Sequence, residues 1–519
     1  MALKKHHIIP FIGCLFITAI CSVSINCNQD HKKDITKNDG KSLSEKYCKS
    51  CHQYVGADML DQETWVKHVL PAMAPRLGIN VYAEDLYVND PFSKSAIPYE
   101  DWLKIVKYYK NAAPKALKPA RSPVAPVKDW GVFTLLKPVH DKVVAATTTM
   151  VAFDTIGHHI FTSDRLNSSI FKWSDGLKLQ SSHKYSSPAV DVQFSKDAQG
   201  KEQGAFTFIG SMDAIDILNG YLMDIGISEL SVKNEKTIAQ NLPRPVQSLS
   251  ADFNKDGLED RLICGFGHNA GGLFWYKQLP DKQFEKHVIS TIPGAEHAIT
   301  GDFNHDGWPD VICLFAQADE GIWLFLNDHK GGFTTTNLLR FPPVYGSSSF
   351  QLVDFNHDGK PDILYTSGDN SDYSKILKPF HGVYIYLNQG NYKYKQAYFY
   401  PVNGATKAIA ADFNGDGKLD IALIAFFPDL KNNATEGFTY FEQDRPLHFV
   451  PHHLPLAREG RWICMDVADY DADGKPDIIL GNYALGFINE DGLKPTWNTH
   501  IPFIILKNTG IPAVRAVKN

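Results

Sequence analysis

The sequence predicts a multidomain protein: a small all-α domain followed by an all-β propeller of about seven four-stranded blades. An acidic loop recurs five times, and its first Asp falls at positions 252, 302, 354, 412 and 469. The intervals are therefore 50, 52, 58 and 57 residues, and short apolar runs flank each loop. A period of about 50 residues with several short strands per unit is typical of propeller blades. An upstream segment with helical spacing is separated from the repeats by a Pro-rich stretch.

The length and composition fit a globular protein of more than one domain. The chain has 519 residues, 44% of them hydrophobic, and a formal net charge of -6. This length exceeds the usual size of one domain. The mildly acidic balance gives no indication of nucleic acid binding. Much of the acid lies in the five loops, where a bound cation would neutralise it.

Each acidic loop has the ligand spacing of a site for a hard cation. In Asp302–Asp310, oxygen-bearing side chains occupy positions 1, 3, 5 and 9, and Gly307 at position 6 permits the sharp turn. An EF-hand would need flanking helices and a Glu at position 12, whereas these flanks are predicted strands. We therefore predict five Ca²⁺ sites, with the ligands Asp252, Asn254, Asp256, Asp260, Asp302, Asn304, Asp306, Asp310, Asp354, Asn356, Asp358, Asp362, Asp412, Asn414, Asp416, Asp420, Asp469, Asp471, Asp473 and Asp477.

One repeat shows the expected blade, with the cation loop between its first two strands. These strands are predicted over Glu296–Phe303, Asp310–Phe315, Gly321–Leu326 and Phe333–Leu339. One or two periods upstream lie two weaker units that lack the full loop. Their strands are predicted over Val143–Asp154, His159–Thr162, Ala189–Phe194 and Ala205–Ile209. Five intact and two degenerate units make about seven blades.

The last repeat lacks an outer strand. Strands are predicted at Asp477–Leu480 and Pro502–Leu506, and no fourth strand follows them. Upstream of the first repeat, Gly131–Leu136 has the pattern of an outer strand without a blade of its own. Propellers close by pairing the two chain ends in one blade, which removes exposed edges. We predict that Gly131–Leu136 is the outer strand of the last blade.

The repeats resemble the FG-GAP/VCBS family, whose Asp-x-Asn-x-Asp-Gly loops bind Ca²⁺ in β-propellers. The resemblance is strong over about 250–490 and weaker over 130–250. It implies a propeller over 131–508, followed by a tail over 509–519, in which the cations are structural rather than catalytic. The fusion of such repeats to a cytochrome resembles exported proteins of Bacteroidetes and related bacteria.

The N-terminus has the features of an export signal. Lys4 and Lys5 precede an apolar core within residues 1–27, although an uncleaved membrane helix is the alternative. Cys21 or Cys27 could carry a lipid anchor after cleavage, and the sequence does not decide between them. Residues 28–42 are predicted to be a flexible tether. We therefore expect a periplasmic, outer-membrane or cell-surface protein.

The motif Cys48-Lys49-Ser50-Cys51-His52 predicts covalent attachment of haem. Two thiols three residues apart can each add to a vinyl group of one haem, and the adjacent His52 can reach the iron. A redox dithiol and half of a zinc site are the alternatives. A zinc site would need a second Cys/His pair, and the next Cys is Cys264. A thioredoxin-like dithiol would need a βαβ context, which is not indicated here.

Residues 43–116 resemble a small class I cytochrome c domain. The resemblance implies a first helix at Ser42–Tyr54 that carries the motif and a final helix at Tyr99–Ala113. It also implies a distal Met ligand beside Pro, which favours Met73; the alternatives are Met59, His68 or no protein ligand. Residues 117–130 are predicted to be a Pro-rich, semi-rigid linker.

Three functions remain open on this basis. The first is an electron carrier that passes electrons to a redox partner protein while its propeller docks a partner or ligand. The second is an oxidoreductase whose propeller feeds its own haem, and the third is a surface glycan-binding or adhesion module. No catalytic residue is indicated, and the first function is preferred over an enzyme. A glycan or anion would bind at the propeller face where the first strands begin, at Arg244, His297, Ser348, Lys407, Arg458 and Arg461.

Overall fold

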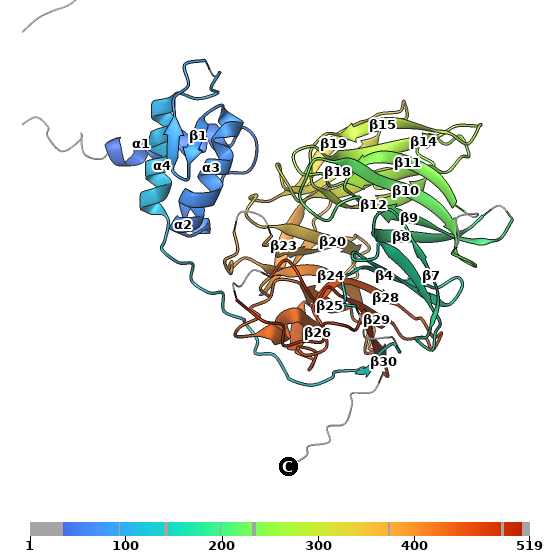
Figure 1. Cartoon of the computed structure of the whole chain (residues 1–519). Helices are drawn as coiled ribbons and strands as arrows, with labels where there is room; N and C mark the ends of the chain where they lie inside the picture. Colours follow the sequence, from blue (N-terminus) through green and yellow to red (C-terminus); the bar gives the residue numbers. More distant parts are fainter. Residues whose placement is uncertain are drawn as a thin grey trace, which may run out of the picture.

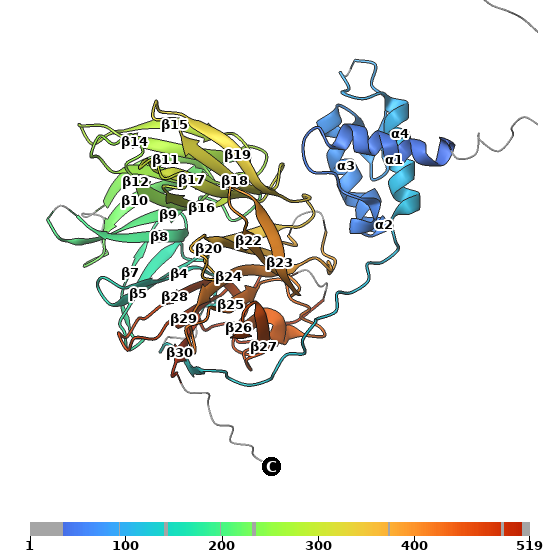
Figure 2. The same cartoon turned by 180° about the vertical axis from the view of Figure 1, so that it is seen from behind.

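The computed structural model describes residues 35–510 apart from 93, 140–143, 198, 231–234, 372–373 and 489–491. The predicted export segment, with Cys21 and Cys27, lies outside the described residues, as do residues 28–34 of the predicted tether and 511–519 of the tail. Within the described range, no helix has the length and apolar character needed to span a membrane. A small helical domain and a ring of β-sheets are joined by an extended segment (Figure 1 and, from behind, Figure 2).

Seven four-stranded sheets form a β-propeller, as the repeat spacing predicts. The first strands of neighbouring sheets contact one another around the ring, so each sheet is innermost at its first strand. From the innermost strand outward, blade 1 consists of β4 (Thr148–Asp154), β5 (His159–Asp164), β6 (Ser169–Trp173) and β7 (Leu179–Lys184), and blade 2 of β8 (Ala189–Lys196), β9 (Glu202–Phe208), β10 (Leu218–Gly226) and β11 (Glu235–Pro243). In the same order, blade 3 consists of β12 (Pro245–Ala251), β13 (Asp260–Gly265), β14 (Gly272–Gln278) and β15 (Phe284–Ser290), blade 4 of β16 (Ala295–Gly301), β17 (Asp310–Phe315), β18 (Gly321–Asn327) and β19 (Phe333–Arg340), and blade 5 of β20 (Ser347–Val353), β21 (Asp362–Ser367), β22 (Gly382–Asn388) and β23 (Tyr394–Pro401). Blade 6 consists of β24 (Ala405–Ala411), β25 (Asp420–Ala425), β26 (Phe438–Arg445) and β27 (His448–His452), and blade 7 of β28 (Trp462–Ala468), β29 (Asp477–Asn482), β30 (Phe503–Asn508) and β3 (Phe133–Leu136).

The ring closes through a strand from the start of the propeller. β3 pairs antiparallel with β30, and Phe133 lies opposite Asn508 while Leu136 lies opposite Ile505. This pairing confirms that the segment predicted at Gly131–Leu136 completes the last blade. Because one blade contains both ends of the repeat array, opening the ring requires the loss of a complete strand pairing.

Apolar side chains fill the spaces between neighbouring blades. Between blades 5 and 6, Phe355 and Leu364 pack with Ala408 and Leu423. The second strands are the most enclosed, and β17 and β21 are buried at every position. A strand that is buried on both faces has a continuous apolar run. Such runs, placed directly after each acidic loop, explain why the blade plan can be derived from the sequence.

The helical domain is built around two helices, α1 (Ile35–Cys48) and α4 (Tyr99–Ala112), which pack against each other. A Cβ at Gly40 would lie 2.4 Å from Lys104 O, so this glycine allows the close approach of α1 to α4. The bounds of α4 agree with the predicted final helix. The shorter elements between them are η1 (Ala57–Met59), α2 (Gln62–Thr64), η2 (Trp65–Val69), α3 (Leu70–Met73), η3 (Pro75–Leu77), β1 (Asn80–Ala83) and β2 (Leu86–Val88).

The predicted first helix, Ser42–Tyr54, has the wrong bounds. α1 ends at Cys48 and begins within the segment 28–42 that was expected to be a flexible tether. Both Ser50 N and Ser50 Oγ donate hydrogen bonds to Tyr47 O, at 3.3 and 2.7 Å. A serine side chain that bonds a nearby carbonyl competes with helical hydrogen bonding. The predicted attachment motif therefore begins at Cys48, the last residue of the helix, and continues into the turn that follows.

The predicted Pro-rich linker runs along the propeller. Val127 N donates to Pro451 O and His453 N donates to Val127 O, both at 2.8 Å. Val127 thereby pairs beside β27, the outer strand of blade 6. An unpaired outer strand is open to association with other chains, and the linker covers part of this one.

The helical domain contacts the face of the propeller opposite the acidic loops. Those loops join first to second strands, so in an antiparallel blade the second-to-third and fourth-to-first connections lie on the other face, here named the opposite face. Arg76 Nη2 donates a hydrogen bond to Asn269 Oδ1, in the connection between β13 and β14. Val344, before β20, and Ile376, between β21 and β22, pack against the core of the helical domain. All three propeller residues belong to the opposite face.

Candidate functional site

The predicted haem-attachment motif begins at the last residue of α1. Cys48 is half-buried, Cys51 is exposed, and both thiols are free. Burial, and then the neighbouring Cys51, raises the pKa of the Cys48 thiol to about 11, so this thiol is protonated at neutral pH. Two unpaired thiols three residues apart are therefore available for covalent attachment.

His52, the last residue of the motif, has the hydrogen bonding expected of a metal ligand. Its Nδ1 donates to Gln53 O at 2.7 Å. A carbonyl acceptor places the proton on Nδ1 and leaves the lone pair on Nε2, as in most metal-binding histidines. Three buried polar atoms of this domain have no hydrogen-bond partner in the described part of the chain: Gln53 Oε1, Tyr87 Oη and Trp102 Nε1. Buried polar atoms are nearly always paired, so these residues fit a domain that holds a further group.

The structure places the candidate distal ligands without deciding among them. Met73 is the last residue of α3, and both Met73 and Met59 pack against the core of the helical domain. His68 lies in η2 and is exposed. The assignment of Met73 as the distal ligand stays a prediction.

In each acidic loop, the side chains at positions 1 and 5 accept hydrogen bonds from backbone N–H groups of the same loop. In the loop of blade 4, Asp302 accepts hydrogen bonds from Asp306 N at 3.0 Å and from Gly307 N at 2.8 Å. Asn304 Oδ1 also accepts from Asp306 N at 3.0 Å. Positions 4 and 6 have positive φ in all five loops, such as 83° at Gly307, which explains the glycine at position 6. The predicted ligands thus come from a turn that the backbone itself holds.

A positively charged or ionisable side chain contacts the position-5 carboxylate of every loop. In blade 4, His329 Nε2 lies 2.8 Å from Asp306 Oδ2. The corresponding pairs in blades 3, 5, 6 and 7 are Lys277 with Asp256, Lys360 with Asp358, Lys418 with Asp416, and Lys475 with Asp473. These basic side chains balance the charge of the position-5 carboxylates, and Ca²⁺ binding by the loops stays a prediction.

The position-9 aspartates have a second role that the spacing alone does not reveal. Each is fully buried, and four of them bond the backbone N–H groups of two segments. In blade 5, Asp362 accepts from Phe355 N at 3.0 Å and from Asn388 N at 2.8 Å. Asp260, Asp310 and Asp420 make the same pair of bonds in their own blades. We call these residues the buried clamps, because they fasten the acidic loop to the end of the third strand.

The loop of blade 7 brings its carboxylates closest together. Oxygens of Asp469, Asp471 and Asp477 lie within 4.8 Å of one another. Asp477 is fully buried, and its Oδ2 has no hydrogen-bond partner in the described residues. Burial raises the pKa of Asp477 to about 6. An unpaired buried carboxylate oxygen beside two other carboxylates fits a Ca²⁺ ligand set.

Two arginines of the predicted basic ring on the opposite face serve the fold. Arg461 is buried and donates to the carbonyls of Phe426, Gly486 and Phe487 at 3.1, 2.6 and 2.7 Å. Its guanidinium also lies 3.7 Å from the centroid of the Phe426 ring. Arg244 donates to Gly267 O at 2.6 Å. These guanidinium groups join connections of neighbouring blades, and their hydrogen-bonding capacity is largely used within the protein.

Among the other residues of the ring, some make contacts within the fold and others are exposed. Ser348 Oγ donates to Ala405 O at 3.0 Å, and Arg458 is exposed. Lys407 lies on β24 and His297 on β16, which are both innermost strands. The innermost strands of other blades carry carboxylates. Binding of a glycan or anion at this ring stays a prediction.

The innermost strands carry acidic as well as basic side chains, whereas the sequence predicted a basic and polar set at this face. Burial chiefly raises the pKa of Glu296 to about 7 and of Asp191 to about 6. Burial, and then the charge of Lys407, lowers the pKa of His297 to about 3, so its imidazole is neutral at physiological pH. Asp466 has its pKa raised by burial and accepts a hydrogen bond from Phe153 N at 2.9 Å. Such carboxylates join neighbouring first strands, as Asp191 does by accepting from Ser248 N at 3.1 Å.

The fold and the loops define the class of the propeller: seven four-stranded blades, part of which matches the FG-GAP-like repeat. The model of the FG-GAP-like repeat matches residues 252–313 and 302–365, which contain the acidic loops of blades 3, 4 and 5.

Curated proteins match about a third of the chain. The chain is 29% identical to the T-cell immunomodulatory protein homolog of Plasmodium falciparum over 181 residues, which cover 32% of this chain and 24% of that protein. It is 27% identical to cartilage acidic protein 1 of Mus musculus over 182 residues, which cover 33% of this chain and 26% of that protein. The chain thus spans about a quarter of the length of these relatives.

Solved structures resemble the chain in general architecture. The virginiamycin B lyase from Staphylococcus aureus matches with a TM-score of 0.43 and 10% identity, over 72% of this chain and 98% of that chain. A luciferin-regenerating enzyme matches with a TM-score of 0.35 and 9% identity, over 74% of this chain and 99% of that chain. Likeness at this level concerns overall shape and does not extend to the residues of a site.

Proposed function

We propose that the protein is an exported electron-transfer protein whose helical domain carries a covalently attached c-type haem. The observation that carries this proposal is the hydrogen bond from His52 Nδ1 to Gln53 O, at 2.7 Å, beside two free thiols. A redox dithiol would not need His52 to present a lone pair on Nε2. This arrangement therefore favours haem attachment over the alternatives for the motif.

The residues of the helical domain have separate roles under this proposal. Cys48 and Cys51 would hold the haem through thioether bonds, His52 would be the proximal ligand, and Met73 the distal ligand. Bound haem supplies reversible one-electron transfer at iron. The core around Trp65 would exclude water from the group and limit reorganisation on electron transfer.

The propeller would dock a partner or ligand, with Ca²⁺ bound in its five loops for stability. The acidic loops lie on one face and the helical domain on the opposite face, so cation binding and docking would not compete for one surface. A lipid anchor in the N-terminal segment would attach the protein to a membrane. A redox partner protein would then exchange electrons with the helical domain.

A second candidate is an oxidoreductase whose propeller passes electrons to its own haem. The position of the helical domain favours it, because Arg76, three residues after Met73, contacts Asn269 of the propeller. A ligand held on the opposite face would then lie beside the domain that accepts its electrons. A surface glycan-binding or adhesion module, the third candidate, would not need this contact.

Absorption spectra of protein produced with haem-maturation factors test the proposal. We expect a reduced c-type spectrum that survives denaturation, and its loss in the double variant Cys48→Ala/Cys51→Ala. Met73→Ala should abolish the weak long-wavelength band of Fe(III)–Met ligation, whereas the control Met59→Leu should retain it. Absence of covalent haem in the wild-type protein would refute the electron-transfer proposal.

The same spectra separate the carrier from the oxidoreductase. Reduction by a chemical reductant or a reduced redox protein alone favours the carrier. Reduction by an added organic donor, such as a sugar or an alcohol, favours the oxidoreductase. An equal rate of donor-driven reduction in a preparation of the isolated helical domain would exclude a catalytic role for the propeller.

A further inference from the structure

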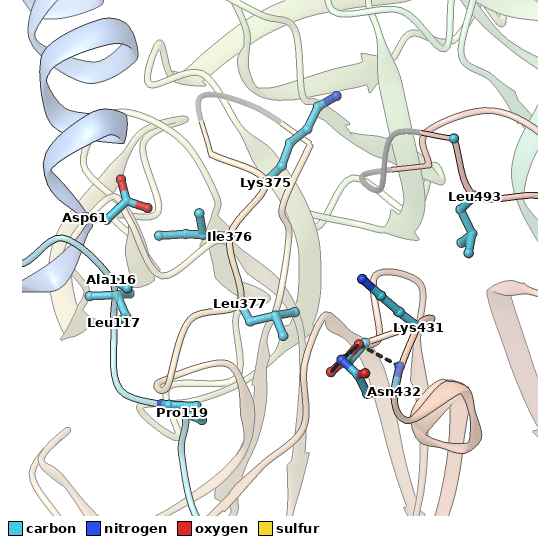
Figure 3. A pocket seen from close by; sticks show the side chains of 12 residues that line it. Asp61, Ala116, Leu117, Pro119, Lys375, Ile376, Leu377, Lys431, Asn432 and Leu493 are labelled. Atoms are coloured by element: carbon cyan, nitrogen blue, oxygen red, sulfur yellow. Dashed lines mark hydrogen bonds between the residues drawn. The ribbon is translucent and has the colours of Figure 1, made fainter.

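A cavity of about 750 Å³ lies between the helical domain, the linker and the opposite face of the propeller (Figure 3). Pockets at domain boundaries with volumes of roughly 300–1,000 Å³ are typical ligand sites. The helical domain contributes two lining residues, the linker two, and connections between second and third strands of blades 5, 6 and 7 the rest. The lining residues are Asp61, Ala116, Leu117, Pro119, Lys375, Ile376, Leu377, Asp429, Lys431, Asn432, Gly492 and Leu493.

We propose that this cavity binds an organic anion with an apolar body, such as an aromatic or medium-chain carboxylate. The assignment names the class of ligand that the propeller holds beside the helical domain. A redox role for such a ligand rests on the proposed function. Binding itself involves only the residues of the cavity and does not require the haem.

The apolar side of the cavity comes from parts of the chain that are distant in sequence. Leu117 of the linker, Leu377 of blade 5 and Leu493 of blade 7 all line it. Leu377 is 45% exposed. Ile376 beside it packs against the core of the helical domain, so the position of Leu377 is tied to the contact between the domains. An apolar ligand body would cover this exposed surface.

The two carboxylates that line the cavity already accept hydrogen bonds from nearby donors. Asp61 is the N-cap of α2, and its Oδ1 accepts from Thr64 N at 2.7 Å. Asp429 accepts from Asn432 N at 3.0 Å and from Asn432 Nδ2 at 3.1 and 3.0 Å. Their negative charge is thus partly balanced by the local turn and helix end, which leaves them less suited to receive a cationic ligand.

Lys375 and Lys431 also line the cavity, and each carries a positive charge. Figure 3 shows Lys431 extending toward the space between Leu377 and Leu493. An ammonium group at the edge of an apolar surface is complementary to a ligand with an acidic head and an apolar body. A neutral sugar would match the aliphatic lining poorly.

Fluorescence titration of the full-length haem-loaded protein with 1-anilinonaphthalene-8-sulfonate, an aromatic anion, tests the assignment. We expect saturable binding that weakens at least about tenfold in Lys375→Glu/Lys431→Glu and in Leu377→Asp. Lys395→Glu, which reverses an exposed charge on β23 of the same blade, is the matched control and should bind as the wild type does. Octanoate should displace the probe, and octylamine at the same concentration should not.

Unchanged probe binding in both cavity variants would overturn the proposal, and so would equal displacement by octylamine. If the double charge reversal fails to fold, as judged by near-ultraviolet circular dichroism, Lys375→Gln/Lys431→Gln should still weaken binding several-fold. The absorption spectrum reports the haem independently of the probe. A protein without covalent haem that binds the anion would therefore refute the electron-transfer proposal and retain the cavity assignment.

Discussion

Every blade has a connection from its first to its second strand. The side chains that hold this connection differ between blades 3 to 7 and blades 1 and 2. Blades 3 to 7 use loops with several carboxylates and the buried clamps. In blade 1, Asp154 alone caps the turn by accepting from Ile156 N at 3.1 Å and Gly157 N at 3.0 Å. In blade 2, Asp197 accepts from Gln199 N at 2.9 Å and Lys201 N at 2.8 Å.

The difference shows what the additional carboxylates contribute. A single aspartate satisfies the backbone of a tight turn without a bound ion. Three or four acids in one short loop repel one another until a cation binds, so the stability of such a loop depends on that cation. On the proposal that the five acidic loops bind Ca²⁺, the propeller would combine blades whose turns depend on the cation with blades whose turns do not.

Removal of a buried clamp should produce the largest effect. Asp362→Ala leaves the N–H groups of Phe355 and Asn388 without their acceptor, and we expect a loss of about 3 kcal/mol in the free energy of unfolding. Asp197→Ala in blade 2 should cost about 1 kcal/mol or less, because its turn is partly exposed. Urea denaturation in the presence of a chelator isolates the clamp from cation binding, and equal losses in both variants would contradict the comparison.

Chelation should destabilise the two groups of blades unequally. A site saturated about 100-fold above its dissociation constant contributes about 2.7 kcal/mol, so removal of Ca²⁺ should lower the melting temperature of the propeller. Hydrogen exchange should accelerate in the loops 252–260, 302–310, 354–362, 412–420 and 469–477. The turns of blades 1 and 2 are the internal control, and faster exchange there to the same degree would refute the distinction.

A reciprocal pair of variants can compare one acidic loop with another. Asp471→Asn gives the blade 7 loop the Asn that the other loops carry at position 3, and should weaken Ca²⁺ binding about tenfold at that site. Asn304→Asp makes the opposite change in blade 4 and should strengthen binding there. Calorimetry with Ca²⁺ measures both, and an affinity that is insensitive to these changes would show that position 3 does not supply a ligand.

The smallest expected effect is a pH dependence confined to blade 1. Burial, and then Lys172, lowers the pKa of His159, which lies 3.8 Å from Asp154 through its Nδ1. A lowered pKa disfavours the protonated form in the folded state, so this contribution to stability is present above the ordinary value of 6.5 and is lost as the pH falls below it. The protection of residues 154–160 against hydrogen exchange, corrected for the pH dependence of the intrinsic exchange rate, should fall between pH 7 and 5.

His159→Gln removes the titrating group and should flatten that profile, whereas a chelator should leave it unchanged. A profile that responds to the chelator instead would mean that blade 1 also depends on a cation.

Much of the propeller could be predicted because its signals are local. The acidic loops recur at a nearly constant interval, and each is followed by a short apolar run such as Asp310–Phe315. The missing outer strand of the last blade was identified by the same local pattern, and β3 occupies it. The bounds of α1 were less predictable, because Ser50 ends the helix through its own hydrogen bond to Tyr47 O.

The roles of single polar residues were harder to foresee. Arg461 is of a residue type that often binds anions, yet its guanidinium donates hydrogen bonds to carbonyl groups of two other connections. Its partners are 25 to 35 residues away along the chain, and no short pattern marks them. The clamp role of Asp362 is hidden for a similar reason, because Asn388 N is 26 residues away.

The sequence by itself determined the propeller, the number of its blades, the strand that closes the ring and the side chains present in each acidic loop. Repetition makes this possible, because every blade is encoded by the same short-range spacing of Asp, Asn, Gly and apolar residues. Only the tertiary structure decided where the helical domain lies, since its contact with the propeller joins Arg76 to Asn269, 193 residues apart. The cavity between them likewise exists only where helix, linker and three blades meet, because it is formed by contacts across the whole chain.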